Sequence, residues 1–149
     1  MVMSVSFLGE SAIRSTLKLP LFVSKVSAGF PSPAQDYVEQ TLDLNELCIK
    51  RPAATFFVRV EGDSMIEAGI FHNDILVVDR SVKPVHGDIV VAQVDGEFTV
   101  KELWLRPKLM LLPRNSAFQP ICFANDNELQ IFGVVTNVIR QMNRSHKNL

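Results

Sequence analysis

Short apolar runs separated by turn-forming residues are the feature of this sequence that most limits its fold. Six such runs follow one another at close spacing, at residues 54–60, 74–79, 88–94, 97–105, 109–113 and 128–139. Several short runs with no long helical pattern and no internal repeat are typical of a compact, mainly β domain. Asp95 and Gly96 lie between two of the runs, and this pair favours a tight hairpin because both residues tolerate positive φ. The sequence therefore predicts a mainly β fold.

The regions outside these runs predict how the chain is divided. A chain of 149 residues has room for one domain with an arm and a tail. We expect residues 1–40 to form a mobile N-terminal arm, residues 41–140 to form the β domain and residues 141–149 to form a disordered tail. No apolar run is long enough to cross a membrane.

Three segments near the N-terminus carry weaker signals. Residues 1–18 show no clear periodicity, which indicates a mobile extension. Residues 19–26 are mostly apolar and include a proline, which favours an extended piece that docks in a groove. The leucine spacing in residues 41–50 fits a short helix or a strand, and we favour one turn of helix at residues 44–47.

Composition excludes several function classes. The hydrophobic content of 47% can form a core, and the net charge of −1 gives no general attraction to nucleic acid. Cys48 and Cys122 form no CxxC motif, so we expect them to pack as small apolar side chains in a reduced, cytoplasmic compartment. No cluster of His, Cys and Asp has metal-ligand spacing, so we expect no metal and no cofactor.

Ser64 is the candidate nucleophile. The apolar run before it ends at Gly62, and Ser64 follows two residues later, on a turn where its hydroxyl can leave the sheet for a surface cleft. A serine hydroxyl is a weak nucleophile without a neighbouring base. The last position of a G-x-S-x-G hydrolase elbow is Ile66 here, so that class of site is not indicated. Another base must therefore activate Ser64.

Lys101 is the candidate base. Strand alternation places Lys101 on one face with Thr99 and Leu103, while the neighbouring Glu102 points to the other face and cannot neutralise it. An apolar setting lowers the pKa of a lysine, which makes its amine a usable general base. The alternative without catalysis is that Ser64 is an ordinary turn residue and Lys101 a solvated lysine on a strand. Residue types alone favour that alternative. Ser15 and Lys18 also match S-x-x-K, but they lie in the predicted arm without accompanying motifs.

The motifs around both residues resemble a known family. GDSM at residues 62–65 and EFTVK at residues 97–101 are similar to the LexA/UmuD family of self-cleaving Ser–Lys peptidases. Members cut an Ala-Gly or Cys-Gly bond upstream of the serine, and the Ala28-Gly29 bond followed by FPSPA matches that pattern. Prolines after this bond favour exposed, irregular backbone, although an ordinary linker would look the same. The similarity covers roughly residues 19–138, including DYVEQ and GVV motifs.

This resemblance implies a fold, a mechanism and partners. It implies a LexA-type β domain in which Lys101 takes the Ser64 proton while the hydroxyl attacks the Ala28 carbonyl, with the backbone N–H groups of Asp63 and Ser64 stabilising the oxyanion. The lysine then returns the proton to the Gly29 amine. One alternative is a β-domain interaction scaffold for a polymerase in which the Ser–Lys pair is vestigial. Another is a self-cleaving regulator that lacks a DNA-binding domain.

The length of the arm separates two branches of this family. Only 28 residues precede Gly29, too few for the helix-turn-helix domain of a LexA-type repressor, so we expect the UmuD-like branch with no sequence-specific DNA binding. That branch implies a homodimer and a RecA–single-stranded-DNA filament that stimulates cleavage. It also implies a cleaved product that assists an error-prone, UmuC-like Y-family DNA polymerase in SOS mutagenesis and translesion synthesis.

Overall fold

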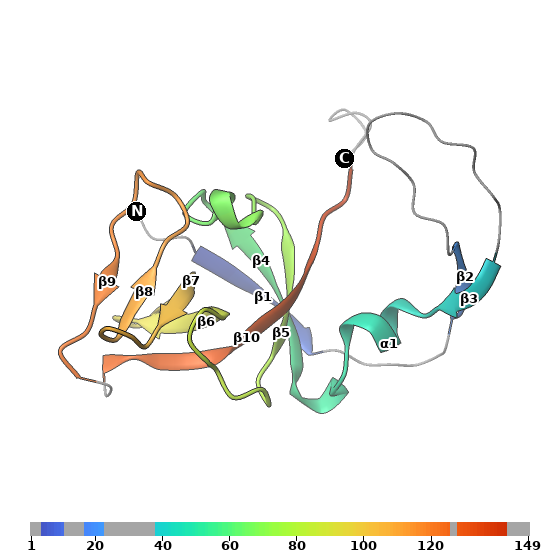
Figure 1. The fold of residues 1–149 in the computed structure, drawn as a ribbon, viewed down its shortest axis with the longest axis horizontal. Helices are drawn as coiled ribbons and strands as arrows, with labels where there is room; N and C mark the ends of the chain where they lie inside the picture. The colour runs from blue at the N-terminus through green and yellow to red at the C-terminus, as the bar shows by residue number, and fades with distance from the viewer. Residues whose placement is uncertain (1–3, 11–16, 23–37, 126–127, 143–149) are drawn as a thin grey trace.

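The chain forms one large antiparallel sheet and one small one (Figure 1). The computed structural model describes residues 4–10, 17–22, 38–125 and 128–142. Eight strands form the large sheet in the order β1-β4-β5-β10-β6-β7-β8-β9. They are β1 (Ser4–Glu10), β4 (Thr55–Glu61), β5 (Ile75–Asp79), β6 (Ile89–Val94), β7 (Glu97–Trp104), β8 (Met110–Leu112), β9 (Ile121–Cys122) and β10 (Gln130–Ile139). The mainly β prediction is confirmed.

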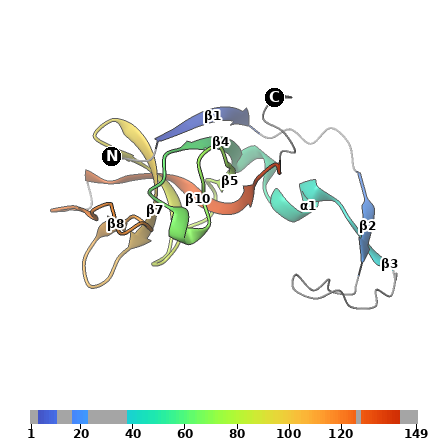
Figure 2. The ribbon, with the colours of Figure 1, turned by 90° about the horizontal axis from the view of Figure 1, so that it is seen from above.

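A two-stranded sheet and a short helix lie to one side of the large sheet in both views (Figures 1 and 2). Strands β2 (Leu19–Phe22) and β3 (Val38–Leu42) pair antiparallel in a two-stranded sheet, and α1 (Leu44–Cys48) follows. Two short 3-10 turns, η1 (Pro52–Ala54) and η2 (Ile66–Ala68), flank β4. In the part of the chain that the structure describes, no helix has the length and apolar character needed to cross a membrane.

Most sequence-predicted elements occur where expected. Each of the six predicted runs contains a strand, and the predicted turn of helix at residues 44–47 lies within α1. The predicted hairpin joins β6 to β7, with φ of 51° at Asp95 and 81° at Gly96. Residues 19–22 are extended as predicted and pair with β3, while the predicted docking of residues 19–26 in a groove stays a prediction. The two-residue strand β9 was not predicted.

The prediction of a mobile extension for residues 1–18 is wrong for residues 4–10. This segment forms β1, which pairs antiparallel with β4 at one edge of the large sheet. Polar and apolar residues alternate from Ser4 to Phe7, and that period-two pattern is a strand signal. β1 therefore belongs to the β domain and not to the arm predicted for residues 1–40.

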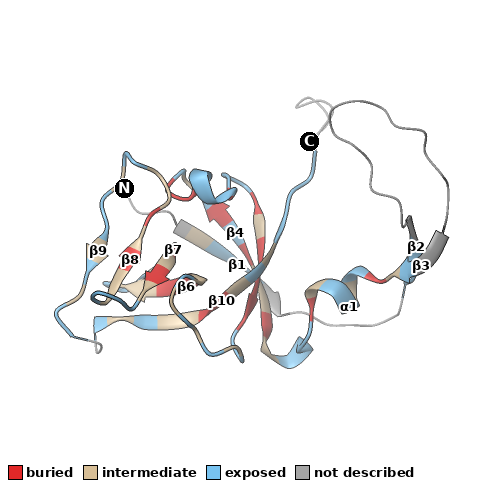
Figure 3. Cartoon of the chain, in the orientation of Figure 1, coloured by how far each residue is buried: buried red, intermediate tan, exposed pale blue. Residues whose placement is uncertain are grey.

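The large sheet curls strongly, so that β1 contacts strands that are not its neighbours in the sheet. The Phe7 ring packs edge-on against Phe98 of β7 and Phe132 of β10, with centroid distances of 5.0 and 4.9 Å. Figure 3 shows that buried residues concentrate in the strands of this sheet.

Two core clusters fill the curled sheet. The first contains Val58, Val60, Met65, Ile70, Leu76, Val78, Val91 and Val100. The second contains Val90, Ala92, Leu103, Leu111 and Val134. Burying this apolar surface is the main favourable contribution to folding. Val100 belongs to the first cluster and Leu103 to the second, so β7 contributes side chains to both.

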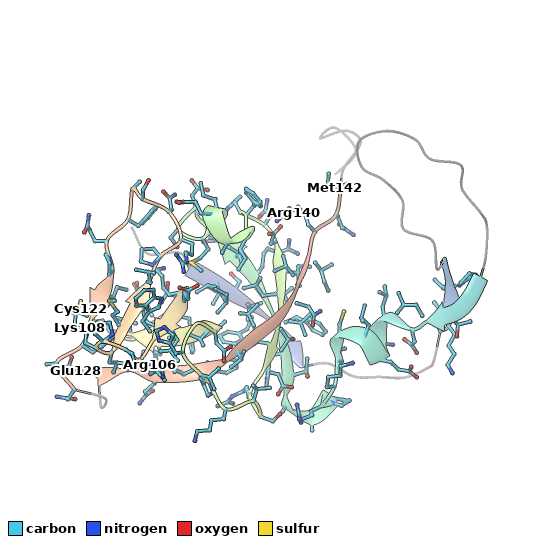
Figure 4. All side chains as sticks on the ribbon, viewed as in Figure 1. Arg106, Lys108, Cys122, Glu128, Arg140 and Met142 are labelled. Atoms are coloured by element: carbon cyan, nitrogen blue, oxygen red, sulfur yellow. The ribbon has the colours of Figure 1, made fainter. Side chains whose placement is uncertain are left out.

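An ion pair fixes the end of β10 to the loop after η2. Arg140, which follows β10 (Figure 4), donates to the carboxylate of Asp74 through Nε and a terminal nitrogen, both at 2.6 Å. It also donates to the Gly69 carbonyl and lies over the Phe71 ring. Burial raises the pKa of Asp74, but hydrogen bonds from Arg140 and the Phe71 N–H outweigh that effect and bring it below its usual range.

Candidate active site

A tight turn after β4 places Ser64. The strand ends at Glu61, and Gly62 has a φ of 98°, which few residues other than glycine adopt. Met65 is fully buried in the first core cluster, so the residue after Ser64 fastens the turn to the core. The Ser64 carbonyl accepts a hydrogen bond from the Arg114 N–H at 2.8 Å. The turn is therefore held from both the core and a distant loop.

Strand β7 places Lys101 against this turn. Lys101 pairs with Val90 of β6, and its side chain is 2% exposed. Its Nζ lies 3.1 Å from the Ser64 Oγ, although the two residues are 37 positions apart in the chain. The amine also donates to the Thr99 hydroxyl at 2.7 Å and to the Val100 carbonyl at 3.1 Å. Three oxygens thus fix the direction of the amine.

Within the described part of the chain, the Lys101 amine forms no hydrogen bond to a carboxylate. The nearest acid in sequence, Glu102, points to the other face of β7 and pairs with Arg114 and the Trp104 indole. Burial without a counter-charge lowers the pKa of Lys101 to about 8. About a tenth of the amine is therefore neutral at pH 7, far more than for a lysine with the ordinary pKa, and a general base requires this neutral form.

The structure brings together the residues that the sequence singled out as a pair. Ser64 and Lys101 are in hydrogen-bond contact, and the Asp63 and Ser64 backbone lies in the same turn. The predicted cleavage site, Ala28 and Gly29, lies outside the described residues. The catalytic roles of Ser64, of Lys101 and of the Asp63 and Ser64 backbone N–H groups remain predictions.

Two details of the site differ from the sequence-based expectation. Ser64 and Lys101 were expected at a surface cleft, but they are 0% and 2% exposed. Met65, the residue after Ser64, lies in the first core cluster, and β7 is an interior strand of the large sheet between β6 and β8. Cys48 is half-buried, whereas Cys122 is exposed and not packed as an apolar side chain (Figure 4).

Sequence reasoning did not assign a role to Thr99. It placed Thr99 on the same strand face as Lys101, and a hydroxyl two residues from a buried amine was a usable signal for a hydrogen-bond partner. Among the described residues, no group of three or more His, Cys, Asp or Glu side chains could hold a metal ion. Lys18, one of the two rival S-x-x-K residues, is exposed, and Ser15 lies outside the described residues.

Comparisons with known proteins point to one family. The family model described as Peptidase S24-like matches residues 20–136. The chain is 57% identical to Protein SamA of Salmonella typhimurium over 132 residues, which is 89% of this chain and 91% of that protein. It is 46% identical to Protein MucA of Escherichia coli, covering 91% and 93% of the two chains. It is 42% identical to the LexA repressor of Caldicellulosiruptor saccharolyticus over 87% of this chain and 62% of the repressor.

Proposed function

Because the chain belongs to the Peptidase S24-like family of serine peptidases, we propose that it cuts itself with Ser64 as the nucleophile and Lys101 as the general base. The observation that carries this proposal is the 3.1 Å contact between the Lys101 amine and the Ser64 hydroxyl in a buried setting. A lysine with a pKa of about 8 can accept a proton near neutral pH, which an ordinary surface lysine cannot.

The reaction follows from this contact. The neutral Lys101 amine takes the Ser64 proton while the hydroxyl oxygen attacks the Ala28 carbonyl carbon. The backbone N–H groups of Asp63 and Ser64 stabilise the resulting oxyanion. When the bond to Gly29 breaks, the Lys101 ammonium returns the proton to the departing amine. Water then hydrolyses the ester that links Ala28 to Ser64, with Lys101 again as the base.

The biological role that this chemistry supports is SOS mutagenesis in the cytoplasm. Cleavage at Ala28-Gly29 is stimulated by a RecA–single-stranded-DNA filament, and the product assists a UmuC-like Y-family DNA polymerase in translesion synthesis. The UmuD-like motifs and the similarity to SamA and MucA over about nine tenths of each chain support this role. The chain acts without sequence-specific DNA binding. Residues 41–140 with β1 form the peptidase domain, residues 11–40 contain the cleavage site, and residues 141–149 form the tail.

The protein acts as a homodimer through the groove between α1 and the end of β10. This groove has a volume of about 460 Å³ and exposes apolar side chains. Leu44, Leu47, Val138 and Ile139 line it and are 64, 48, 41 and 41% exposed. Contiguous exposed apolar side chains mark association surfaces. Ile139→Glu should therefore give a monomer by analytical ultracentrifugation at micromolar concentration, whereas a wild-type monomer would contradict the proposed dimer.

The test of the cleavage proposal is a single assay on four proteins. Wild type, Ser64→Ala, Lys101→Ala and the control Lys83→Ala, which changes an exposed lysine, are each mixed with RecA filament. Fragments are identified by mass. We expect the two site variants to be slower by on the order of 10³-fold or more, because the dyad acts as a unit. Processing of either site variant at the wild-type rate would contradict the assignment. Absence of cleavage in all four proteins would favour the interaction scaffold.

A further inference from the structure

The peptide bond before Ser64 is held by a side chain from a distant loop. The Asp63 carbonyl oxygen accepts a hydrogen bond from Asn115 Nδ2 at 2.9 Å and a longer one from the Ile66 N–H at 3.3 Å. The other end of the Asn115 amide, Oδ1, accepts from the Ala117 N–H at 3.0 Å. Both ends of the amide are engaged, so its orientation is fixed.

Holding this carbonyl also fixes the Ser64 N–H. A peptide unit is planar and trans, so its C=O and N–H point in opposite directions. The Asp63 oxygen and the Ser64 N–H belong to the same peptide unit. Asn115 therefore determines where the Ser64 N–H points, and among the described residues the structure gives no acceptor for that N–H.

We propose that Asn115 is a positioning residue for self-cleavage, which holds the peptide before Ser64 so that the Ser64 N–H faces the oxyanion of the reacting carbonyl. The inference rests on the proposed function, because it takes Ser64 as the nucleophile. Asn115 touches neither the reacting atoms nor Lys101 in this scheme. It acts only through the Asp63 carbonyl.

Arg114, the residue before Asn115, holds the peptide unit that follows Ser64, in this case through its backbone. The Arg114 N–H donates to the Ser64 carbonyl at 2.8 Å, and the Arg114 carbonyl accepts from the Glu67 N–H at 2.8 Å. Two consecutive residues of one loop thus hold the peptide units on both sides of Ser64. A single contact of this kind could be incidental, but contacts to both units fix the turn as a whole.

The loop that holds the nucleophile is also fastened to the strand that carries the base. The Arg114 side chain pairs with Glu102, the residue after Lys101 in β7, with an Nε to Oε1 distance of 3.1 Å. The Glu102 carboxylate also accepts from the Trp104 indole. These contacts fix the Ser64 hydroxyl, the Ser64 N–H and the Lys101 amine relative to one another. An oxyanion site needs donors that are preorganised in this way.

Asn115→Asp is the most informative substitution. It keeps the size of the side chain and the acceptor for the Ala117 N–H, but it replaces the donor to the Asp63 carbonyl with an oxygen that repels it. Asn115→Ala removes the donor without adding charge. Gln119→Glu, on an exposed side chain of the same loop, controls for the added negative charge.

The assay is the first-order rate of self-cleavage of the full chain from neutral to strongly alkaline pH. We expect both Asn115 variants to lower the alkaline plateau by on the order of 10²-fold, the range seen when an oxyanion donor is lost. For Asn115→Ala the midpoint of the profile should stay where wild type has it, because the Lys101 amine keeps its partners. Gln119→Glu should match wild type in both values.

Thermal unfolding and amide NMR separate positioning from a purely structural role. On an inactive Ser64→Ala background, the amide resonance at position 64 should shift in the Asn115 variants while the β6 amides stay in place. A wild-type plateau in both variants, a change of midpoint alone, or rate loss explained by unfolding would each overturn the inference. If wild type cleaves and the Asn115 variants match it, only this inference fails. If wild type does not cleave, the proposed function fails with it.

Discussion

Lys101 should make the stability of the folded protein depend on pH in a way that one substitution removes. Burial lowers its pKa from the ordinary 10.5 to about 8 in the folded state. Between these two values the unfolded chain binds the proton and the folded chain does not, so stability rises as pH increases from about 8 to 10.5. At about 1.4 kcal/mol per pH unit, this difference corresponds to about 3 kcal/mol.

The comparison uses Ser64→Ala and the double variant Ser64→Ala/Lys101→Met. The alanine prevents self-cleavage during the measurement, and methionine has nearly the length of lysine without a charge. Urea unfolding is followed by the fluorescence of Trp104, the single tryptophan. The quantity compared is the free energy of unfolding of the double variant minus that of the Ser64→Ala protein. We expect this difference to be larger at pH 7 than at pH 11 by about 3 kcal/mol. Other groups titrate in both proteins and cancel.

The result that would refute this reasoning is a difference that stays constant from pH 7 to pH 11. It would mean that the pKa of Lys101 is not depressed in the folded protein. Lys83→Met on the Ser64→Ala background is the matched control, because Lys83 is exposed and its substitution should give that flat difference. The sign of the expected change does not depend on the contacts that methionine loses, since those contribute at both pH values.

Three further substitutions test separate parts of the structure. Thr99→Val removes the hydroxyl that accepts from Lys101 at 2.7 Å, and cleavage measured by mass should slow by about tenfold, since one charge-assisted hydrogen bond is lost; an unchanged rate would contradict this. Gly133→Ala would place a Cβ 2.7 Å from Val78 Cγ1, and urea unfolding should show a loss of about 1–3 kcal/mol, whereas no loss would mean that β5 shifts freely. Asp74→Asn weakens the ion pair that holds β10, and it should cost about 2 kcal/mol at pH 7. That cost should shrink as pH falls below 3.8, because a carboxylate with a lowered pKa stabilises the fold only while ionised; a constant cost would contradict it.

Local patterns were enough to predict most strands and the strand face on which Lys101 lies. The alternation in residues 97–105 placed Lys101 on an apolar face away from Glu102, and the structure has both features. The hairpin at Asp95 and Gly96 followed from backbone preferences of those two residues alone. Such features depend on neighbours in the chain, so a single sequence contains them.

Features that depend on distant contacts were not predictable from these patterns. β1 carries only a four-residue alternation as a local strand signal, and its place at the sheet edge depends on its pairing with β4 and on the contacts of Phe7. The burial of Ser64 and the role of Asn115 depend on a loop about 50 residues away that packs on the turn. Patterns among neighbouring residues carry no information on which distant loop packs on the Ser64 turn.

The pH dependence of self-cleavage by the protein alone tests the central claim most directly. The protein is incubated without filament from neutral to strongly alkaline pH, with Ser64→Ala as the control, and fragments are identified by mass. If the Lys101 amine is the base, cleavage at Ala28-Gly29 should rise through a midpoint near pH 8, level off above it, and be absent from the control. A rate that does not change with pH, or cuts at any other bond, would contradict the account.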